Sequence, residues 1–256
     1  LMCLLLLAYR SHPDYPLIVA ANRDEFHSRP TAPAQWWSDY PKVLGGRDLV
    51  GGGSWLGVTS SGRFAAITNF RDPNSLSPER PSRGLLISDF LINSVSPVDY
   101  LVDLTQRGGD YNGFNLLLAD RDGLWGYSNR EGEIRGMAPD FFGVSNGPFD
   151  SSWPKVIRGR ERLRAIVGGD NTIEIEELFD LLSDRRQAED DQLPQTGIDL
   201  ELERLLSPSF IVSPDYGTRS STVVLLKEDG TLRFIERTFD PQGVKSGEVD
   251  FTHSAT

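Results

Sequence analysis

Residues 1–26 read LMCLLLLAYRSHPDYPLIVAANRDEF and contain the strongest structural signal in the chain. Two apolar runs, residues 1–10 and 17–21, flank a segment with two prolines and an aspartate, which is typical of a turn. We therefore predict a β-hairpin at the start of the chain. Because neither run alternates apolar with polar residues, both strands are expected to be buried on both faces, as in stacked sheets.

Strands and helices follow one another in blocks along the rest of the chain. A polar, aromatic loop is expected at 25–42, and a glycine cluster follows at 45–57. Beyond them, apolar patterns predict strands at 55–58, 64–68, 114–119, 124–128, 142–144, 222–226 and 232–237, and helices at 81–95, 97–107, 153–167 and 175–182. No proline- or serine-rich linker interrupts this order, which predicts a single α+β domain over residues 1–256 with sheets stacked between helices.

The composition excludes several classes of protein. The 256 residues include 26 Lys and Arg against 37 Asp and Glu, and the net charge of −11 opposes binding to nucleic acid or an anionic membrane surface. One cysteine and three histidines exclude an intramolecular disulfide framework and a cysteine-based zinc cluster, so no metal or cofactor is expected. The apolar start (1–9) is shorter than the about 20 residues of a membrane span, so a cytoplasmic protein is expected.

Cys3 is the first candidate for chemistry. Translation is expected to begin at Met2, and removal of Met2 before a small residue would leave Cys3 at the N-terminus. A terminal cysteine carries a thiol and, in its α-amine, a base with a pKa of about 7.7–8.0, so it needs no separate histidine. The alternative is that Cys3 is a small apolar side chain buried in a strand, as most free cysteines are.

Asn22-Arg23-Asp24-Glu25 places four polar residues at the end of an apolar strand. Side chains alternate along a strand, so Asn22 and Asp24 share one face while Arg23 and Glu25 share the other. If this strand pairs with the first, Asp24 can reach the start of the chain and hold its ammonium group. The alternative is a charged strand end that enters solvent.

Seven motifs lie in order along nearly the whole chain. They are Met2-Cys3, 20–26 (AANRDEF), 53–57 (GSWLG), 66–70 (AITNF), 111–116 (YNGFNL), 143–146 (GVSN) and 216–222 (YGTRSST). Together they resemble the NRDE family, which includes the animal transport and Golgi organisation proteins. More distantly, the chain is similar to the choloylglycine hydrolase and penicillin V acylase branch of the N-terminal nucleophile (Ntn) hydrolases. The resemblance implies a four-layer αββα sandwich, which agrees with the predicted order of elements.

The distant resemblance also implies roles for single residues. It implies that Cys3 is the nucleophile, that Asp24 positions its α-amine and that Arg219 lies beside the thiol. It further implies that Asn69 and Asn146 form the oxyanion hole, in which each donor is worth about 2.7–4 kcal/mol.

One departure from the acylase pattern concerns an arginine. In the acylases an arginine directly precedes the Asn-x-Asp, whereas this chain has Ala21 there and Arg23 two residues later. The shift keeps Arg23 on the same face of the strand but moves it about 6.6 Å further along. We therefore expect catalysis to depend more on Arg219 than on Arg23.

Three functions are compatible with these residues, one of which is a purely structural or partner-binding protein with a vestigial pocket. The leading hypothesis is an Ntn-type cysteine amidohydrolase that cleaves a small linear N-acyl amide, with Asn22, Arg23, Trp55 and Phe70 contacting the substrate. The alternative is a non-catalytic carrier or chaperone that binds haem or a lipid-like ligand on the same fold, because one pocket can serve either role. Phe70 and the other aromatic residues can instead belong to the core.

Overall fold

The predicted hairpin lies inside a six-stranded antiparallel sheet. The computed structural model describes residues 2–149, 151–169 and 173–254. Within it, β1 (Met2–Tyr9) pairs with β2 (Leu17–Phe26) so that Leu5 lies opposite Ala21 and Cys3 opposite Arg23. The strand order is β10-β1-β2-β11-β12-β13, in which the remaining strands are β10 (Asp140–Val144), β11 (Tyr216–Leu226), β12 (Leu232–Phe239) and β13 (Lys245–His253).

A second antiparallel sheet of seven strands packs against the first. Its strands follow the chain in simple order, so each one pairs with the next. They are β3 (Thr31–Trp36), β4 (Val43–Asp48), β5 (Leu56–Thr59), β6 (Phe64–Asn69), β7 (Phe114–Ala119), β8 (Leu124–Ser128) and β9 (Ile134–Gly136).

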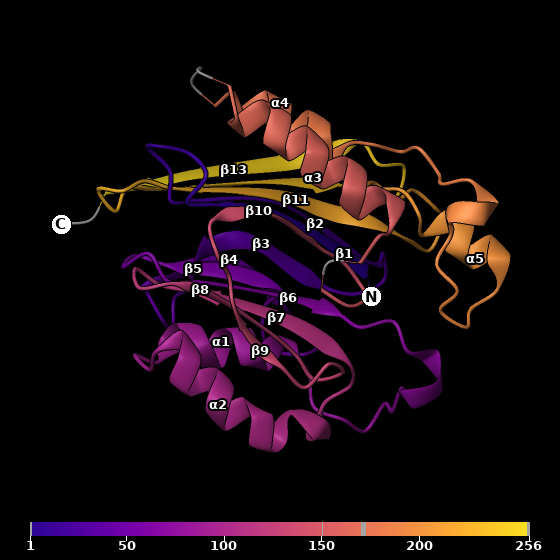
Figure 1. Cartoon of the computed structure of the whole chain (residues 1–256), viewed down its shortest axis with the longest axis horizontal. Coiled ribbons are helices and arrows are strands. Elements are labelled where there is room, and N and C mark those ends of the chain that lie inside the picture. Colours follow the sequence, from indigo (N-terminus) through magenta and orange to yellow (C-terminus); the bar gives the residue numbers. More distant parts are fainter. Residues whose placement is uncertain (1, 150, 170–172, 255–256) are drawn as a thin grey trace.

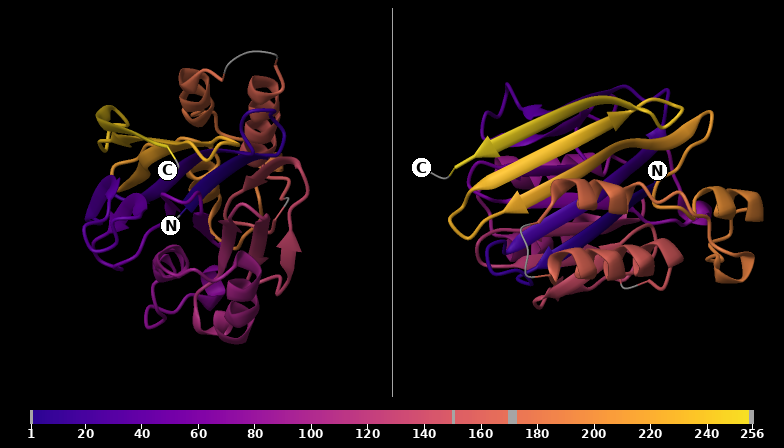
Figure 2. Two further views of the ribbon diagram at one scale, coloured as in Figure 1. Left: turned by 90° about the vertical axis from the view of Figure 1, so that its left-hand side faces the viewer. Right: turned by 90° about the horizontal axis from the view of Figure 1, so that it is seen from above.

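Helices cover the outer faces of both sheets (Figure 1). α1 (Gly84–Ile92) and α2 (Pro97–Arg107) pack on the seven-stranded sheet, whereas α3 (Pro154–Val167) and α4 (Ile175–Leu182) pack on the six-stranded sheet. The view from above in Figure 2 shows α3 and α4 lying over that sheet, with α5 (Leu200–Leu205) beyond its end. The layers are therefore helix, sheet, sheet and helix, which confirms the predicted αββα sandwich.

β1 is buried on both faces, as its unbroken apolar run predicted. Leu4 and Leu6 belong to the core between the six-stranded sheet and α3 and α4. Leu5 and Leu7 belong to the core between the two sheets. Because β1 is enclosed in this way, a polar group near its start can be placed precisely and shielded from water.

The prediction was wrong for several strands. Residues 25–42 were expected to form a loop, but they contain β3, which has an irregular register next to Pro33 and is only partly buried. The glycine cluster includes β4, in which a Cβ at Gly46 would lie 2.1 Å from the Trp55 ring, so glycine is required for close packing. The strand β13 and the six-residue helix α5 were not predicted, because partly exposed edge strands and short helices have weak apolar periodicity.

No helix in residues 2–149, 151–169 and 173–254 is long and apolar enough to cross a membrane.

Glu236 links the two sheets through a buried carboxyl group. It lies on β12, and its Oε1 accepts a hydrogen bond from the backbone N–H of Ala34 on β3 at 2.7 Å. Burial raises the pKa of Glu236 to about 7, with hydrogen bonds from Ala34 and Thr222 acting in the opposite direction.

This raised pKa predicts a pH-dependent effect of Glu236→Gln. The folded protein holds a proton that the unfolded chain releases above its ordinary pKa, so stability from this group is complete at low pH and falls up to about pH 7. Glutamine cannot ionise, so its contribution does not change with pH. As the pH rises from 4.5 to 8, we therefore expect the unfolding free energy of the variant to increase by about 2–3 kcal/mol relative to that of wild type. Urea unfolding of both proteins at these two pH values measures this change. If the unfolding free energies of variant and wild type differed by the same amount at both pH values, the raised pKa of Glu236 would be contradicted.

Candidate active site

The start of β1 opens into a cavity of about 360 Å³ between the two sheets. Its walls come from β1, β2, the ends of β4 and β6, and the segment before α1. The residues that line it include Cys3, Arg23, Asp24, Glu25, Arg29, Asp48, Trp55, Asn69, Arg80, Arg83 and Asn112. Charged groups of both signs therefore surround the only thiol in the sequence.

Cys3 and Arg23 lie opposite each other on neighbouring strands and on the same side of the sheet. The Arg23 guanidinium stacks over the Trp55 ring at 4.3 Å and lies 3.6 Å from a Glu25 carboxylate oxygen. The charge of Arg23 lowers the pKa of the Cys3 thiol. Arg23 therefore acts on the thiol although it lies two residues further along the strand than the arginine of the acylases.

The Cys3 thiol is nevertheless a weak acid in this form of the chain. Its side chain is 8% exposed, and burial raises its pKa to about 11, followed by the negative charge of Asp24. Arg23 and a hydrogen bond from the Asp24 backbone lower the pKa by less than these two effects raise it. A thiol with this pKa is almost wholly protonated at pH 7, so attack on a carbonyl requires a base close by.

Asp24 is completely buried beside the start of the chain. It pairs with Met2 in the β1–β2 register, and its Oδ1 accepts a 2.6 Å hydrogen bond from the Thr218 hydroxyl. Its Oδ2 is buried and has no hydrogen-bond partner among the described residues. Burial raises the pKa of Asp24 to about 6, which is below neutrality, so the group is mainly ionised at pH 7.

Asn146 and Asn69 also meet at this point. The backbone N–H of Cys3 donates to Asn146 Oδ1 at 3.3 Å, and Asn146 Nδ2 donates to the backbone carbonyl of Asn69 at 2.7 Å. The Ser145 hydroxyl donates to the Cys3 carbonyl oxygen at 2.9 Å. The turn after β10 thus holds Cys3 through both of its backbone polar groups.

Two residues without a predicted role support this turn. The Thr68 hydroxyl donates to the Ser145 carbonyl at 2.6 Å, and Asn115 Nδ2 donates to the carbonyls of Ser145 and Gly147 at 3.2 and 2.8 Å. Both are completely or almost completely buried and lie within motifs that the sequence analysis singled out, at 66–70 and 111–116. These hydrogen bonds join three segments that are far apart in the sequence, around residues 68, 115 and 145–147.

Arg219 does not lie beside the thiol, which corrects another expectation. The register between β11 and β2 shifts between Thr218 and Ser220, so Arg219 is the extra residue of a β-bulge. Its guanidinium donates to the backbone carbonyls of Phe26, His27 and Arg29. It lines a separate cavity, which also contains Arg23 and Trp55.

Two expected substrate contacts also lie elsewhere. Asn22 faces α4, where its amide donates to the carbonyls of Leu182 and Ser209 and accepts from the Ser221 hydroxyl. Because these bonds occupy a fully buried side chain, Asn22 holds the strands together and does not line the cavity of Cys3. Phe70 lines a neighbouring cavity that contains Asn146, not Cys3.

Arg80 and Arg83 are cavity residues that sequence analysis missed. Arg80 lies just before the helix predicted at 81–95, and Arg83 lies within that range as the N-cap of α1. Their guanidinium groups donate to the carbonyls of Tyr111 and Gly113. Burial lowers the pKa of Arg83 to about 10, while the charges of Cys3 and Glu25 oppose this shift. Arg83 remains charged at neutral pH and adds a second cation near the thiol.

The fold defines the class of this protein as an Ntn-hydrolase-type sandwich. A mutant conjugated bile acid hydrolase from Clostridium perfringens has a similar fold, with a TM-score of 0.54 and 10% identity over 98% of this chain and 92% of that one. Residues 2–241 match the family model "Transport and Golgi organisation 2". The chain belongs to this family, which confirms the resemblance stated above.

Curated relatives agree with this assignment. The bovine "Transport and Golgi organization protein 2 homolog" is 34% identical over 256 residues, and the human homologue is 33% identical. Each alignment covers 92% of this chain and 92% of the relative.

Proposed function

We propose that this protein is an Ntn-type cysteine amidohydrolase that cleaves a small linear N-acyl amide, with Cys3 as the N-terminal residue. The observation that carries the proposal is the position of Cys3. Its backbone nitrogen bonds to Asn146 while its thiol lies opposite Arg23, in a cavity that also contains Asn69. The fold shared with a bile acid hydrolase supports the same reaction class.

The reaction follows from the two groups that a terminal cysteine carries. The α-amine takes the thiol proton, and the thiolate forms a bond to the amide carbonyl carbon. Asn69 and Asn146 stabilise the negative charge on the carbonyl oxygen. The α-ammonium then protonates the leaving nitrogen, the carbon–nitrogen bond breaks, and a thioester remains on Cys3. Water, deprotonated by the same amine, attacks the thioester and releases the carboxylic acid and the thiol.

Asp24 and Arg23 have distinct roles in this scheme. The buried carboxylate of Asp24 lies beside the start of the chain and holds the α-amine in place. The guanidinium of Arg23 favours the thiolate, because a nearby positive charge stabilises the charged form of a thiol.

Hydrolysis of a panel of N-acyl amides tests the proposal. Protein that begins at Cys3 is incubated with amides of varied acyl length, and the released amine is measured. Release that depends on enzyme concentration and saturates with substrate supports an amidohydrolase. Saturable binding of haem or a lipid, without hydrolysis of any amide, supports the carrier function and contradicts the proposal.

Asn146→Ala tests the contribution of the oxyanion donor. We expect the variant to lose about 10²–10³-fold in kcat, because a donor that acts on the transition state is removed. The thiol remains present, so alkylation by iodoacetamide should continue at a comparable rate. A kcat within threefold of wild type would contradict the role of Asn146.

A further inference from the structure

Lys155 is a buried cation for which the proposed mechanism gives no role. It lies at the start of α3 and is 1% exposed, although lysine is almost never fully buried without a partner. It shares the buried face of α3 with Gly159, which packs against Leu6 of β1. Its Nζ donates to the carbonyl of Leu206 at 3.0 Å. Within the described residues, no carboxylate oxygen lies within 4 Å of this ammonium.

Asp24 is the charged group that acts most strongly on Lys155. After burial, Asp24 is the largest influence on the pKa of Lys155, and Lys155 is likewise the largest influence on the pKa of Asp24. Both side chains are almost completely buried, and the β1–β2 register places Asp24 opposite Met2, on the same face of the sheet as Leu4, which packs in the core under α3. The unpartnered Oδ2 of Asp24 therefore lies in the field of a cation that it does not contact directly.

We propose that Lys155 is a positioning residue of the active site, which acts through Asp24 to weaken the hold of that carboxylate on the α-ammonium of Cys3. The inference rests on the proposed function, because it requires a chain that begins at Cys3. In such a chain the single charge of Asp24 faces two cations, the α-ammonium and Lys155.

The consequence concerns the protonation state of the α-amine. A carboxylate alone stabilises an ammonium and raises its pKa, which makes the amine a poorer base at neutral pH. A second cation offsets this effect, so more of the α-amine is in the free-base form that can accept the thiol proton. Lys155 itself has a pKa lowered to about 8 by burial, which leaves it mostly charged at pH 7.

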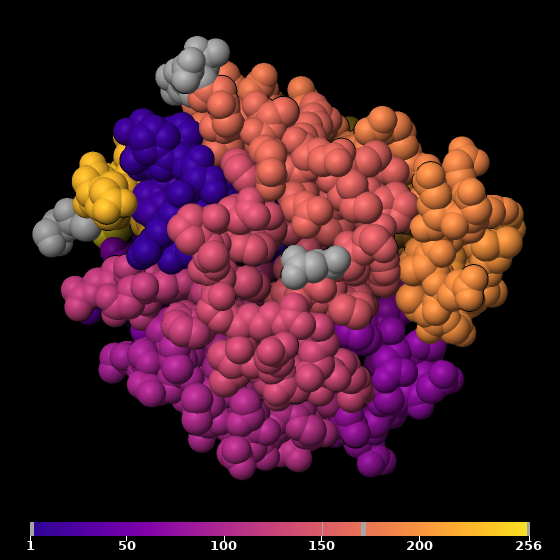
Figure 3. All heavy atoms as spheres, in the orientation of Figure 1, coloured from indigo at the N-terminus to yellow at the C-terminus, as the bar shows by residue number. Residues whose placement is uncertain are grey.

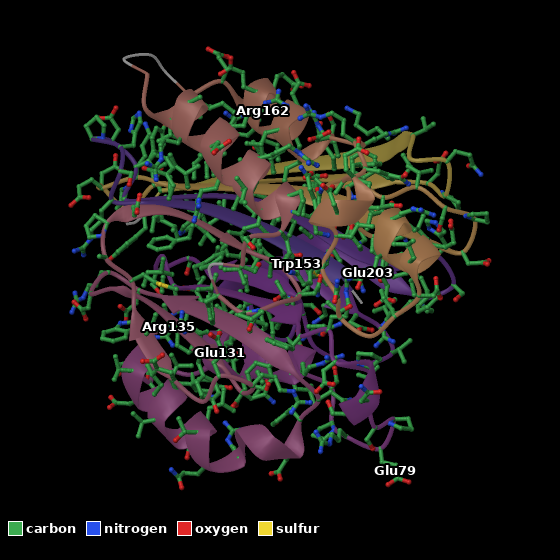
Figure 4. All side chains as sticks on the ribbon, turned by 45° about the vertical axis from the view of Figure 1, so that its right-hand side comes forward. Glu79, Glu131, Arg135, Trp153, Arg162 and Glu203 are labelled. Carbon is green, nitrogen blue, oxygen red and sulfur yellow. The ribbon has the colours of Figure 1, made fainter. Side chains whose placement is uncertain are left out.

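The other charges around this pair have partners of their own. Arg71 and Glu203 also act on Lys155, but they form an ion pair with each other, and the Arg71 guanidinium lies 4.7 Å from the Trp153 ring centre. Figure 4 labels Trp153 and Glu203, which lie near one another in that view. In Figure 3 the segment around α5 lies beside the segment that follows β6. On the side of the cavity, Arg23 and Arg83 are cations that interact electrostatically with Cys3.

The single cysteine of the chain permits a direct test. Protein that begins at Cys3 is labelled with [¹⁵N]cysteine, so that one nitrogen signal reports the α-amine, and its chemical shift is followed from pH 5 to pH 10. We expect Lys155→Met to raise the titration midpoint by about one pH unit, which corresponds to about tenfold less free amine below the midpoint. Lys155→Gln keeps a donor for Leu206 without the charge and should give the same shift.

Two comparisons separate this inference from a structural effect and from the proposed function. Lys42→Met removes an exposed lysine and should leave the midpoint unchanged. A midpoint that stays the same or falls in both Lys155 variants would overturn the inference, whether or not the protein hydrolyses amides. A raised midpoint would support it even if no amide is hydrolysed, and in that case only the proposed function fails.

Discussion

We expect Cys3→Ser to lower amide hydrolysis by roughly 10³-fold or more and to leave the affinity for substrate within about twofold of wild type. Serine is close to cysteine in size, so the cavity keeps its shape and its charged walls. A serine hydroxyl, however, is a much weaker nucleophile near neutral pH, and the terminal amine deprotonates it far less readily than a thiol. The expected signature is thus a loss in kcat with little change in the dissociation constant.

Steady-state kinetics and equilibrium titration with a substrate analogue measure the two effects of this substitution. Cys3→Ala serves as a matched control, because it removes the reactive group without adding a buried hydroxyl. Comparable turnover in wild type and Cys3→Ser would show that the reaction does not proceed through this thiol. Under the carrier function, no protein hydrolyses the amide and all three bind ligand with similar affinity.

We expect any residue that precedes Cys3 to reduce amide hydrolysis by about 100-fold or more. With a peptide bond on its nitrogen, Cys3 has no α-amine, and its buried thiol has a pKa of about 11. At pH 7 only about one thiol in 10⁴ is then ionised, and no base lies on the same residue. Removal of the preceding residues generates that base next to Asp24 and within hydrogen-bond range of Asn146.

The comparison uses two preparations that differ only at the N-terminus, one beginning at Cys3 and the other retaining Met2. Mass spectrometry confirms the first residue of each, and amine release is measured over pH 6–9. Equal rates in the two preparations would exclude the terminal amine as the base. A Cys3→Ser variant of each preparation gives the background rate.

The main features of the fold could be predicted because they depend on local apolar patterns. The enclosed strand β1 has no polar residue between Met2 and Tyr9, and this run alone indicated burial on both faces. Helix α2 begins with Ser96 as its N-cap, whose side chain accepts from the Asp99 N–H, and its bounds matched the prediction. Edge strand β13 was missed because polar residues outnumber apolar ones along it.

The active-site residues could be predicted only in part, because their positions depend on long-range packing. The meeting of Cys3 and Asn146 joins residues that are 143 positions apart, and only the family resemblance pointed to it. Arg219 was misplaced because a bulge in β11 redirects one side chain, and a sequence pattern does not show such a bulge. Lys155 lies in a helix with several exposed arginines, so its burial depends on how α3 packs against β1.

Intact-mass analysis of the acyl-enzyme tests the central claim most directly. Protein that begins at Cys3 is mixed with an activated N-acyl substrate, quenched in acid within one turnover and weighed. The account predicts one added acyl group, located on Cys3 by peptide mapping, that disappears as free acid forms and is absent from Cys3→Ser. A protein that hydrolyses the substrate without such an adduct, or that carries the acyl group on another residue, would contradict it.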